Sequence, residues 1–153
     1  SKMADMYIAM NDIKHAHELF ETLCENTMAD PDDDYKSLSK LYLEKYITKA
    51  VLCSLINKNH VEKYAHYLTA YPTFKVSMKN NFLTFIIDVT EDKDADEIED
   101  MLNNRSHKYN YESTEDNTTK TLLKCIKDML LLQQTEPDQE NEDIDNIDNI
   151  DLI

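Results

Sequence analysis

The chain has 153 residues, which is enough for one domain with a modest core. It carries 31 Asp and Glu against 16 Lys and Arg, and its formal charge of −15 disfavours nucleic acid as a partner and favours a basic protein surface. Glycine is absent, which excludes phosphate-binding loops and dinucleotide fingerprints and favours a helical fold, since helices tolerate that absence best.

Three cysteines, Cys24, Cys53 and Cys125, lie at unrelated spacings in helix-like contexts. This usage predicts buried free thiols in a reducing compartment. The sequence shows no signal peptide, and its apolar runs fall far short of the roughly 20 residues that a membrane span needs. We therefore expect a cytoplasmic protein.

Residues 2–28 predict a helical hairpin. Two sets of apolar residues keep helical spacing, on either side of a turn or cap at Asn11 and Asp12. Ala16 and Phe20 match the small and large pair of the tetratricopeptide pattern, in which the small residue lets two helices approach each other.

The acidic stretch at 30–34 invites comparison with a calcium loop. The comparison fails, because Tyr35 stands at the obligatory glycine position and Leu41 at the position of the bidentate glutamate. We expect a helix cap and a solvated turn instead.

A second helical hairpin is predicted from Ser37 onward. A long helix keeps apolar spacing to Ile56, a break falls at 57–59, and a shorter helix continues through Leu68. Pro72 ends it, because proline lacks the N–H group and disfavours helix in the preceding residue.

The segment at 74–89 fits two structures. It could be two strands around an asparagine-rich turn at 79–81, or a helix with one apolar stripe. The residues of that stripe are Phe82, Phe85, Ile86 and Val89. Helix is favoured, because a lone two-stranded hairpin in a helical chain is marginally stable.

Asp94 and Glu97 have the spacing of a capping box and predict a further helix. Its buried face is Ala95, Ile98, Met101 and Leu102. Residues 104–117 are expected to form a polar loop, and a last amphipathic helix is expected over about 118–133. Its inward residues are Leu122, Leu123, Ile126, Met129 and Leu130. Beyond Thr135 the chain has eight acids and no base, so we expect it to be disordered.

No group of residues has the pattern of a catalytic or metal site. His15 and His17 are too close for a helical pair of ligands, His60 and His66 lie on different helical faces, and the cysteines have no partner motif. We therefore expect a binding protein without enzymatic activity, cofactor or metal.

Five segments follow one another along the chain: DMYIAMNDIKHAHELFE, YITKAVLCSL, YPTF, FLTFIIDVTEDKDADEIEDM and LLKCIKDMLL. Over about residues 3–133 they resemble the C-terminal half of the soluble NSF attachment proteins, and most closely the α type. The resemblance implies an all-α fold of tetratricopeptide-like antiparallel hairpins in a right-handed superhelix that ends in a C-terminal helical bundle. The implied division is 1–72 for the hairpins, 73–134 for the bundle and 135–153 for a disordered acidic tail.

The resemblance also implies an adaptor in SNARE complex disassembly. Such a protein binds the assembled SNARE bundle, with its syntaxin-like subunit, and recruits and stimulates the hexameric ATPase NSF in vesicle fusion and intracellular transport. Peripheral membrane contact would come from an N-terminal half that this chain does not include.

Residue roles are implied by position. Asp88, Glu91 and Asp92 correspond to the acids that meet basic grooves on the N-terminal domain of NSF, and their i, i+3, i+4 spacing places them on one helical face. Leu152 corresponds to the penultimate leucine that stimulates ATP hydrolysis, although the acidic tail here is longer than the family's. A further acid of the family lies near Asn57, where this chain has no carboxylate.

Basic residues along the concave face bind SNAREs in the family. The candidates here are Lys45, Lys49 and Lys79, for which a solvated helix face is the alternative. Two other functions fit the composition. One is a tetratricopeptide-type scaffold that binds a peptide or partner helix, and the other is an acidic mimic of nucleic acid.

Overall fold

The computed structural model describes residues 2–29 and 36–135, which form helices and turns without a strand. In chain order their helices are α1 (Lys2–Ala9), α2 (Ile13–Ala29), α3 (Lys36–Asn57), α4 (His60–Ala70), the 3₁₀ helix η2 (Pro72–Val76), α5 (Met78–Glu91), α6 (Ala95–Asn103), α7 (Asn110–Thr114) and α8 (Asn117–Thr135). The all-α prediction is confirmed. The acidic stretch at 30–34 and the tail beyond Thr135 lie outside the described residues.

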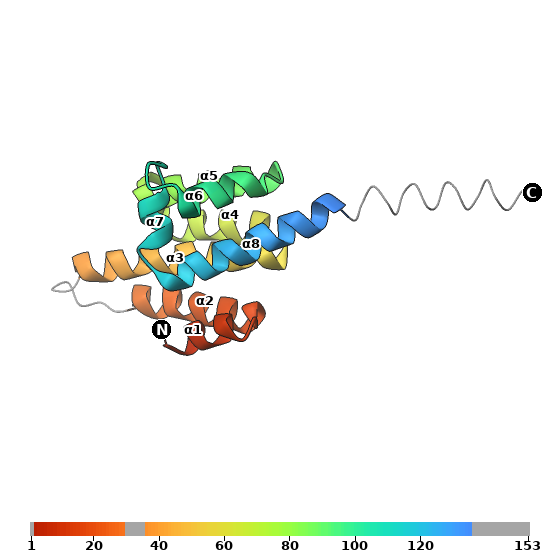
Figure 1. The fold of residues 1–153 in the computed structure, drawn as a ribbon. Coiled ribbons are helices and arrows are strands. Elements are labelled where there is room, and N and C mark those ends of the chain that lie inside the picture. Colours follow the sequence, from red (N-terminus) through yellow and green to blue (C-terminus); the bar gives the residue numbers. More distant parts are fainter. Residues whose placement is uncertain (1, 30–35, 136–153) are drawn as a thin grey trace, which may run out of the picture.

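The helices stack as antiparallel pairs (Figure 1). α1 pairs with α2, α3 with α4 and α5 with α6, and α8 crosses the stack and packs against α1, α3, α6 and α7. One connected hydrophobic core runs through all of these pairs. α8 therefore ties the first hairpin to the last.

The turns between paired helices reach left-handed backbone geometry without glycine. Asn11, Lys58 and Lys93 have φ angles of 61°, 64° and 56°. Residues other than glycine and asparagine seldom adopt these angles. Asp12 then caps α2, since its Oδ1 accepts the N–H of His15 at 3.3 Å. The predicted breaks at 11–12 and 57–59 are confirmed.

α3 is the central helix of the fold. It packs against α2, α4, α5 and α8, and every residue from 47 to 55 is buried. The buried hydroxyls of Thr48 and Ser54 donate to the carbonyl oxygens of Glu44 and Val51, at 2.7 and 2.6 Å. A helix enclosed in this way is buried on every face, and its buried hydroxyls are satisfied by its own backbone.

The segment at 74–89 is helical, as favoured. α4 ends at Ala70, Pro72 opens η2, and the Oγ of Ser77 caps α5 by accepting the N–H of Asn80 at 3.2 Å. The burial pattern excludes strand periodicity. The buried apolar residues of α5 are Phe82, Leu83, Ile86, Ile87 and Val89, whereas Thr84 and Asp88 are exposed.

One prediction was wrong, since residues 104–117 include the short helix α7. Tertiary hydrogen bonds hold it in place. Asn110 Nδ2 donates to the carbonyl oxygens of Met101 and Leu102 at 2.7 and 3.3 Å, and the buried Ser113 Oγ donates to the carbonyl oxygen of Met101 at 3.4 Å. These bonds use the last carbonyls of α6, which an isolated helix leaves unpaired.

The three thiols are free, and two of them are fully buried. Burial, together with nearby carboxylates, raises the pKa of Cys24 to about 12, and burial also raises the pKa of Cys53 to about 12. Cys125 on α8 is half-buried, and burial raises its pKa too.

These environments predict low thiol reactivity in the native chain. At pH 8 we expect Cys24 and Cys53 to react with a disulfide reagent about a thousandfold more slowly than in urea, because the thiolate is the reactive form and its fraction falls tenfold for each unit of pKa. Cys125 should react first, and the Cys125→Ser variant should lack this fast reaction. A second fast thiol in that variant would contradict the buried positions.

Candidate functional site

The C-terminal end of α5 carries the three predicted acids. Asp88 lies in the last turn, Glu91 is the final helical residue, and Asp92 follows with helical dihedral angles. All three side chains are exposed. Within the described residues no ion pair engages Asp88 or Asp92, so their charge is directed to solvent.

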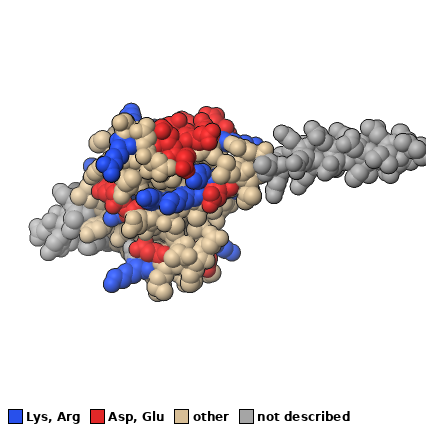
Figure 2. All heavy atoms as spheres, in the orientation of Figure 1, with Lys and Arg blue, Asp and Glu red and all other residues tan. Residues whose placement is uncertain are grey.

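α6 extends this acidic surface. Between residues 88 and 100 the chain has eight carboxylates and one lysine, Lys93, and Figure 2 shows acidic atoms gathered over α5 and α6 at the top of the view. Asp94 caps α6 by accepting the N–H of Glu97 at 3.1 Å, which confirms the predicted cap. A hydrogen bond from Lys127 on α8, with its charge, lowers the pKa of Glu99.

The turn between α3 and α4 lies beside the acidic end of α5. His60 Nε2 is 3.6 Å from Glu91 Oε1, a separation too long for a hydrogen bond but short enough for an ion pair when the imidazole is protonated. The resemblance implies a further acid near Asn57, and the sequence has no carboxylate in this turn. Lys58 occupies it instead and is exposed.

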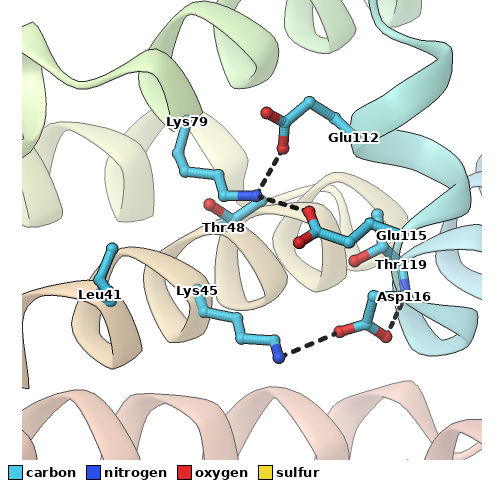
Figure 3. Close-up of a pocket in the computed structure, with 8 residues that line it drawn as sticks. All are labelled: Leu41, Lys45, Thr48, Lys79, Glu112, Glu115, Asp116 and Thr119. Atoms are coloured by element: carbon cyan, nitrogen blue, oxygen red, sulfur yellow. Dashed lines mark hydrogen bonds and ion pairs between the residues drawn. The ribbon is translucent and has the colours of Figure 1, made fainter. Parts of the chain in front are cut away.

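Two of the three predicted lysines line one pocket of about 420 Å³ between α3, α5, α7 and α8 (Figure 3). Its lining residues are Leu41, Lys45, Thr48, Lys79, Glu112, Glu115, Asp116 and Thr119. These lining residues include Lys45 and Lys79, and the third lysine, Lys49, forms an ion pair with Asp116 of the lining. Each of the three faces a carboxylate from the segment that joins α7 to α8.

Lys49 and Asp116 form a buried ion pair. Lys49 Nζ is 2.7 Å from Asp116 Oδ2 and 5.9 Å from the centre of the Phe20 ring, and the lysine side chain is 6% exposed. Asp116 Oδ1 accepts the N–H of Thr118 at 2.8 Å and so also caps α8. Burial would raise the pKa of Asp116, but Lys49, the Thr118 N–H and the charge of Lys45 outweigh burial and lower it.

Lys79 is held by two glutamates. Its Nζ donates to Glu112 Oε2 and lies 3.7 Å from Glu115 Oε2. Burial would lower the pKa of Lys79, yet the two carboxylates raise it. Lys45 is held less firmly, since its Nζ lies 3.8 Å from Asp116 Oδ2 and half of the side chain is exposed.

The carboxylates of this pocket were not singled out from the sequence. They lie in the segment expected to be a polar loop, at Glu112, Glu115 and Asp116. A signal for Asp116 existed, because an aspartate directly before a helical apolar pattern is a typical N-cap. Leu152, the predicted ATPase-stimulating residue, lies outside the described residues.

Glu97, Asp100 and His107 place three potential metal ligands within 4.8 Å of one another. Their hydrogen bonds favour a structural role. His107 Nδ1 accepts the N–H of Tyr109 at 3.1 Å, so the ring hydrogen is on Nε2, which lies 2.8 Å from Glu97 Oε1. A metal on Nε2 would require a hydrogen on Nδ1, against the Tyr109 N–H. The cluster instead fastens the segment after α6 to α6.

A family model described as soluble NSF attachment protein, SNAP, matches residues 1–130. The chain belongs to the soluble NSF attachment protein family. SNAP-family proteins are non-enzymatic adaptors, and this chain is a helical adaptor of the SNAP type. Searches of curated protein sequences and of solved structures return no match to the chain. Among its described helices, none is long and apolar enough to cross a membrane.

Proposed function

We propose that this SNAP-family chain acts in SNARE complex disassembly. It binds assembled SNARE bundles and recruits and stimulates the ATPase NSF in vesicle fusion and intracellular transport, in the cytoplasm and at the membrane periphery. The observation that carries this proposal is the acidic surface at the end of α5, where Asp88, Glu91 and Asp92 are exposed together.

The surface suits a basic partner for electrostatic reasons. Each exposed ion pair contributes only about 0.2 to 1 kcal/mol, so no single contact would hold the ATPase domain. The eight carboxylates between residues 88 and 100 act together, however, and raise the rate of encounter with a basic groove. Several adaptor copies on one hexamer would add avidity.

The remaining roles rest on the family resemblance. We assign SNARE contact to the lysine-lined side of the molecule, where Lys45 and Lys79 reach the pocket and Lys49 supports it through Asp116. We assign stimulation of ATP hydrolysis to Leu152.

Charge reversal of the acidic surface tests the proposal. The triple variant Asp88→Lys, Glu91→Lys and Asp92→Lys should bind the isolated N-terminal domain of the ATPase about threefold to a hundredfold more weakly than wild type, because three favourable pairs are lost. The measurement is a pull-down with that domain at low and high salt. Wild-type binding should weaken as salt rises.

A matched control reverses three exposed glutamates elsewhere, with Glu18→Lys, Glu25→Lys and Glu62→Lys on α2 and α4. It changes the net charge equally and should bind like wild type. Unchanged binding by the triple variant at 88, 91 and 92 would overturn the proposed ATPase contact. It would favour a scaffold that binds a peptide in a groove.

A further inference from the structure

One face of α8 carries a stripe of lysines. Lys120, Lys124 and Lys127 have i, i+4, i+7 spacing and so lie on one side of the helix, and Leu131, which is 45% exposed, continues this side toward the end of α8. These four residues form the α8 stripe. Figure 2 shows a band of basic atoms across the middle of the molecule, where α8 lies in Figure 1 and below the acidic atoms of α5 and α6.

Two lysines of the α8 stripe have no ion pair. Lys127 Nζ pairs with Glu99 Oε2 on α6 at 2.5 Å. Among the residues that the structure describes, no ion pair engages the exposed Lys124 or the half-buried Lys120. Asp128 is the only acid in α8. The stripe therefore keeps positive charge for an acidic segment that reaches it.

Such a segment follows α8 directly in the sequence. Residues 136–153 number 18 and include eight acids, no base, four isoleucines and a leucine. From Thr135 back to Lys120, α8 is about 22 Å long, at about 1.5 Å per residue. An extended segment of 18 residues spans up to about 60 Å. It is long enough to turn back and run along the whole stripe.

We infer that the acidic segment at 136–153 docks back along the α8 stripe of the same chain. Its carboxylates pair with Lys120 and Lys124, and its isoleucines cover Leu131. The docking goes beyond the proposed function and does not depend on it. Under the proposed function it has one consequence, because Leu152 is then held against α8 and stimulates the ATPase only after the segment is released.

Two features favour this occupant over a separate acidic partner. The segment is tethered to the end of α8, and a short tether gives an effective concentration of the order of millimolar, which compensates for exposed pairs that are individually weak. Gln134 Nε2 also donates to the carbonyl oxygen of Lys93 at 2.7 Å, so α8 ends beside the acidic surface of α5 and α6. The eight carboxylates between residues 88 and 100 repel the segment and direct it toward the α8 stripe.

A spin label on the acidic segment measures the docking in the full chain. The label is attached through Asn149→Cys in a Cys125→Ser background, where the remaining thiols, Cys24 and Cys53, are buried. At low salt we expect it to broaden the backbone amide signals of residues 120–131 in NMR spectra. The broadening should disappear at high salt, because salt screens exposed charge pairs.

Charge reversal of the stripe identifies the docking site. Lys120→Glu with Lys124→Glu should lower the ratio of docked to free segment about twofold to thirtyfold, because two exposed pairs are lost. Adding Asp145→Lys and Asp148→Lys to this variant should restore part of the broadening, because opposite charges then face each other again. The control Lys14→Glu with Lys75→Glu changes the net charge equally at exposed positions of α2 and η2, and should leave the broadening as it is without the reversal.

Three results would overturn the inference. The first is an absence of broadening at low salt in the chain without charge reversal, and the second is broadening that the reversal of Lys120 and Lys124 leaves unchanged. The third is broadening that grows with protein concentration, which would place the segment on a second copy of the chain. Binding to the ATPase domain is measured separately, with the variants at 88, 91 and 92, so the proposed function and this docking can fail independently.

Discussion

Replacing Asp116 with alanine is expected to lower the free energy of unfolding by about 3 to 5 kcal/mol, the range for breaking a buried ion pair from one side. Lys49 would keep an unpaired ammonium in a side chain that is 6% exposed, and α8 would lose a cap worth about 1 kcal/mol. Lys49→Met should cost less, because Asp116 is 20% exposed and keeps its backbone donors. Urea unfolding followed by circular dichroism measures both losses.

Two variants separate the charge from the cap. Asp116→Asn keeps an acceptor for the Thr118 N–H, and its free energy of unfolding should lie between those of wild type and Asp116→Ala. Because the pKa of Asp116 is lowered from its ordinary 3.8, the advantage of aspartate over asparagine is fully present above that pH and is lost as the pH falls through the lower, folded-state pKa. Lys45→Met, which removes an exposed contact at 3.8 Å, should cost less than about 1 kcal/mol. An equal loss from Lys45→Met and Lys49→Met would contradict the special role of the buried pair.

The helical hairpins were predictable because their signals are local. Asp12 and Asp94 are caps that the sequence marks by position, and Pro72 ends a helix wherever it stands. The complete burial of 47–55 was not predictable, since one apolar stripe does not show that other helices cover the remaining faces. α7 was missed for a related reason. Its five residues have no apolar period, and bonds from Asn110 to the end of α6 hold it.

The two candidate surfaces also differ in how far the sequence could predict them. The spacing of Asp88, Glu91 and Asp92 within one helix was enough to place all three on the exposed side of α5. The environment of the lysines depends on contacts between distant parts of the chain. Lys49 meets Asp116 and Lys79 meets Glu112 only because α8 folds back across α3 and α5 carries Lys79 to α7.

A loss of similar size is expected at Phe82, one of the fully buried phenylalanines of the core. Phe82→Ala should lower the free energy of unfolding by about 3 to 5 kcal/mol, because it removes a ring that is 1% exposed and leaves a cavity inside the core. The ring also meets that of Tyr109 edge to face, with centroids 5.9 Å apart, so the loss extends to the segment between α6 and α7. Urea unfolding monitored by circular dichroism gives the value.

Two neighbours make the test specific. Phe85 lies on the same helix but is only partly buried, with its ring centroid 4.9 Å from that of Tyr109, so Phe85→Ala should cost less than Phe82→Ala. Val76 in η2 is 88% exposed, and Val76→Ala should leave stability within about 0.5 kcal/mol of wild type. A loss at Val76 as large as that at Phe82 would mean that η2 and α5 bury different faces from those seen here. The exposure of Asp88, Glu91 and Asp92 at the other end of α5 would then lose its structural basis.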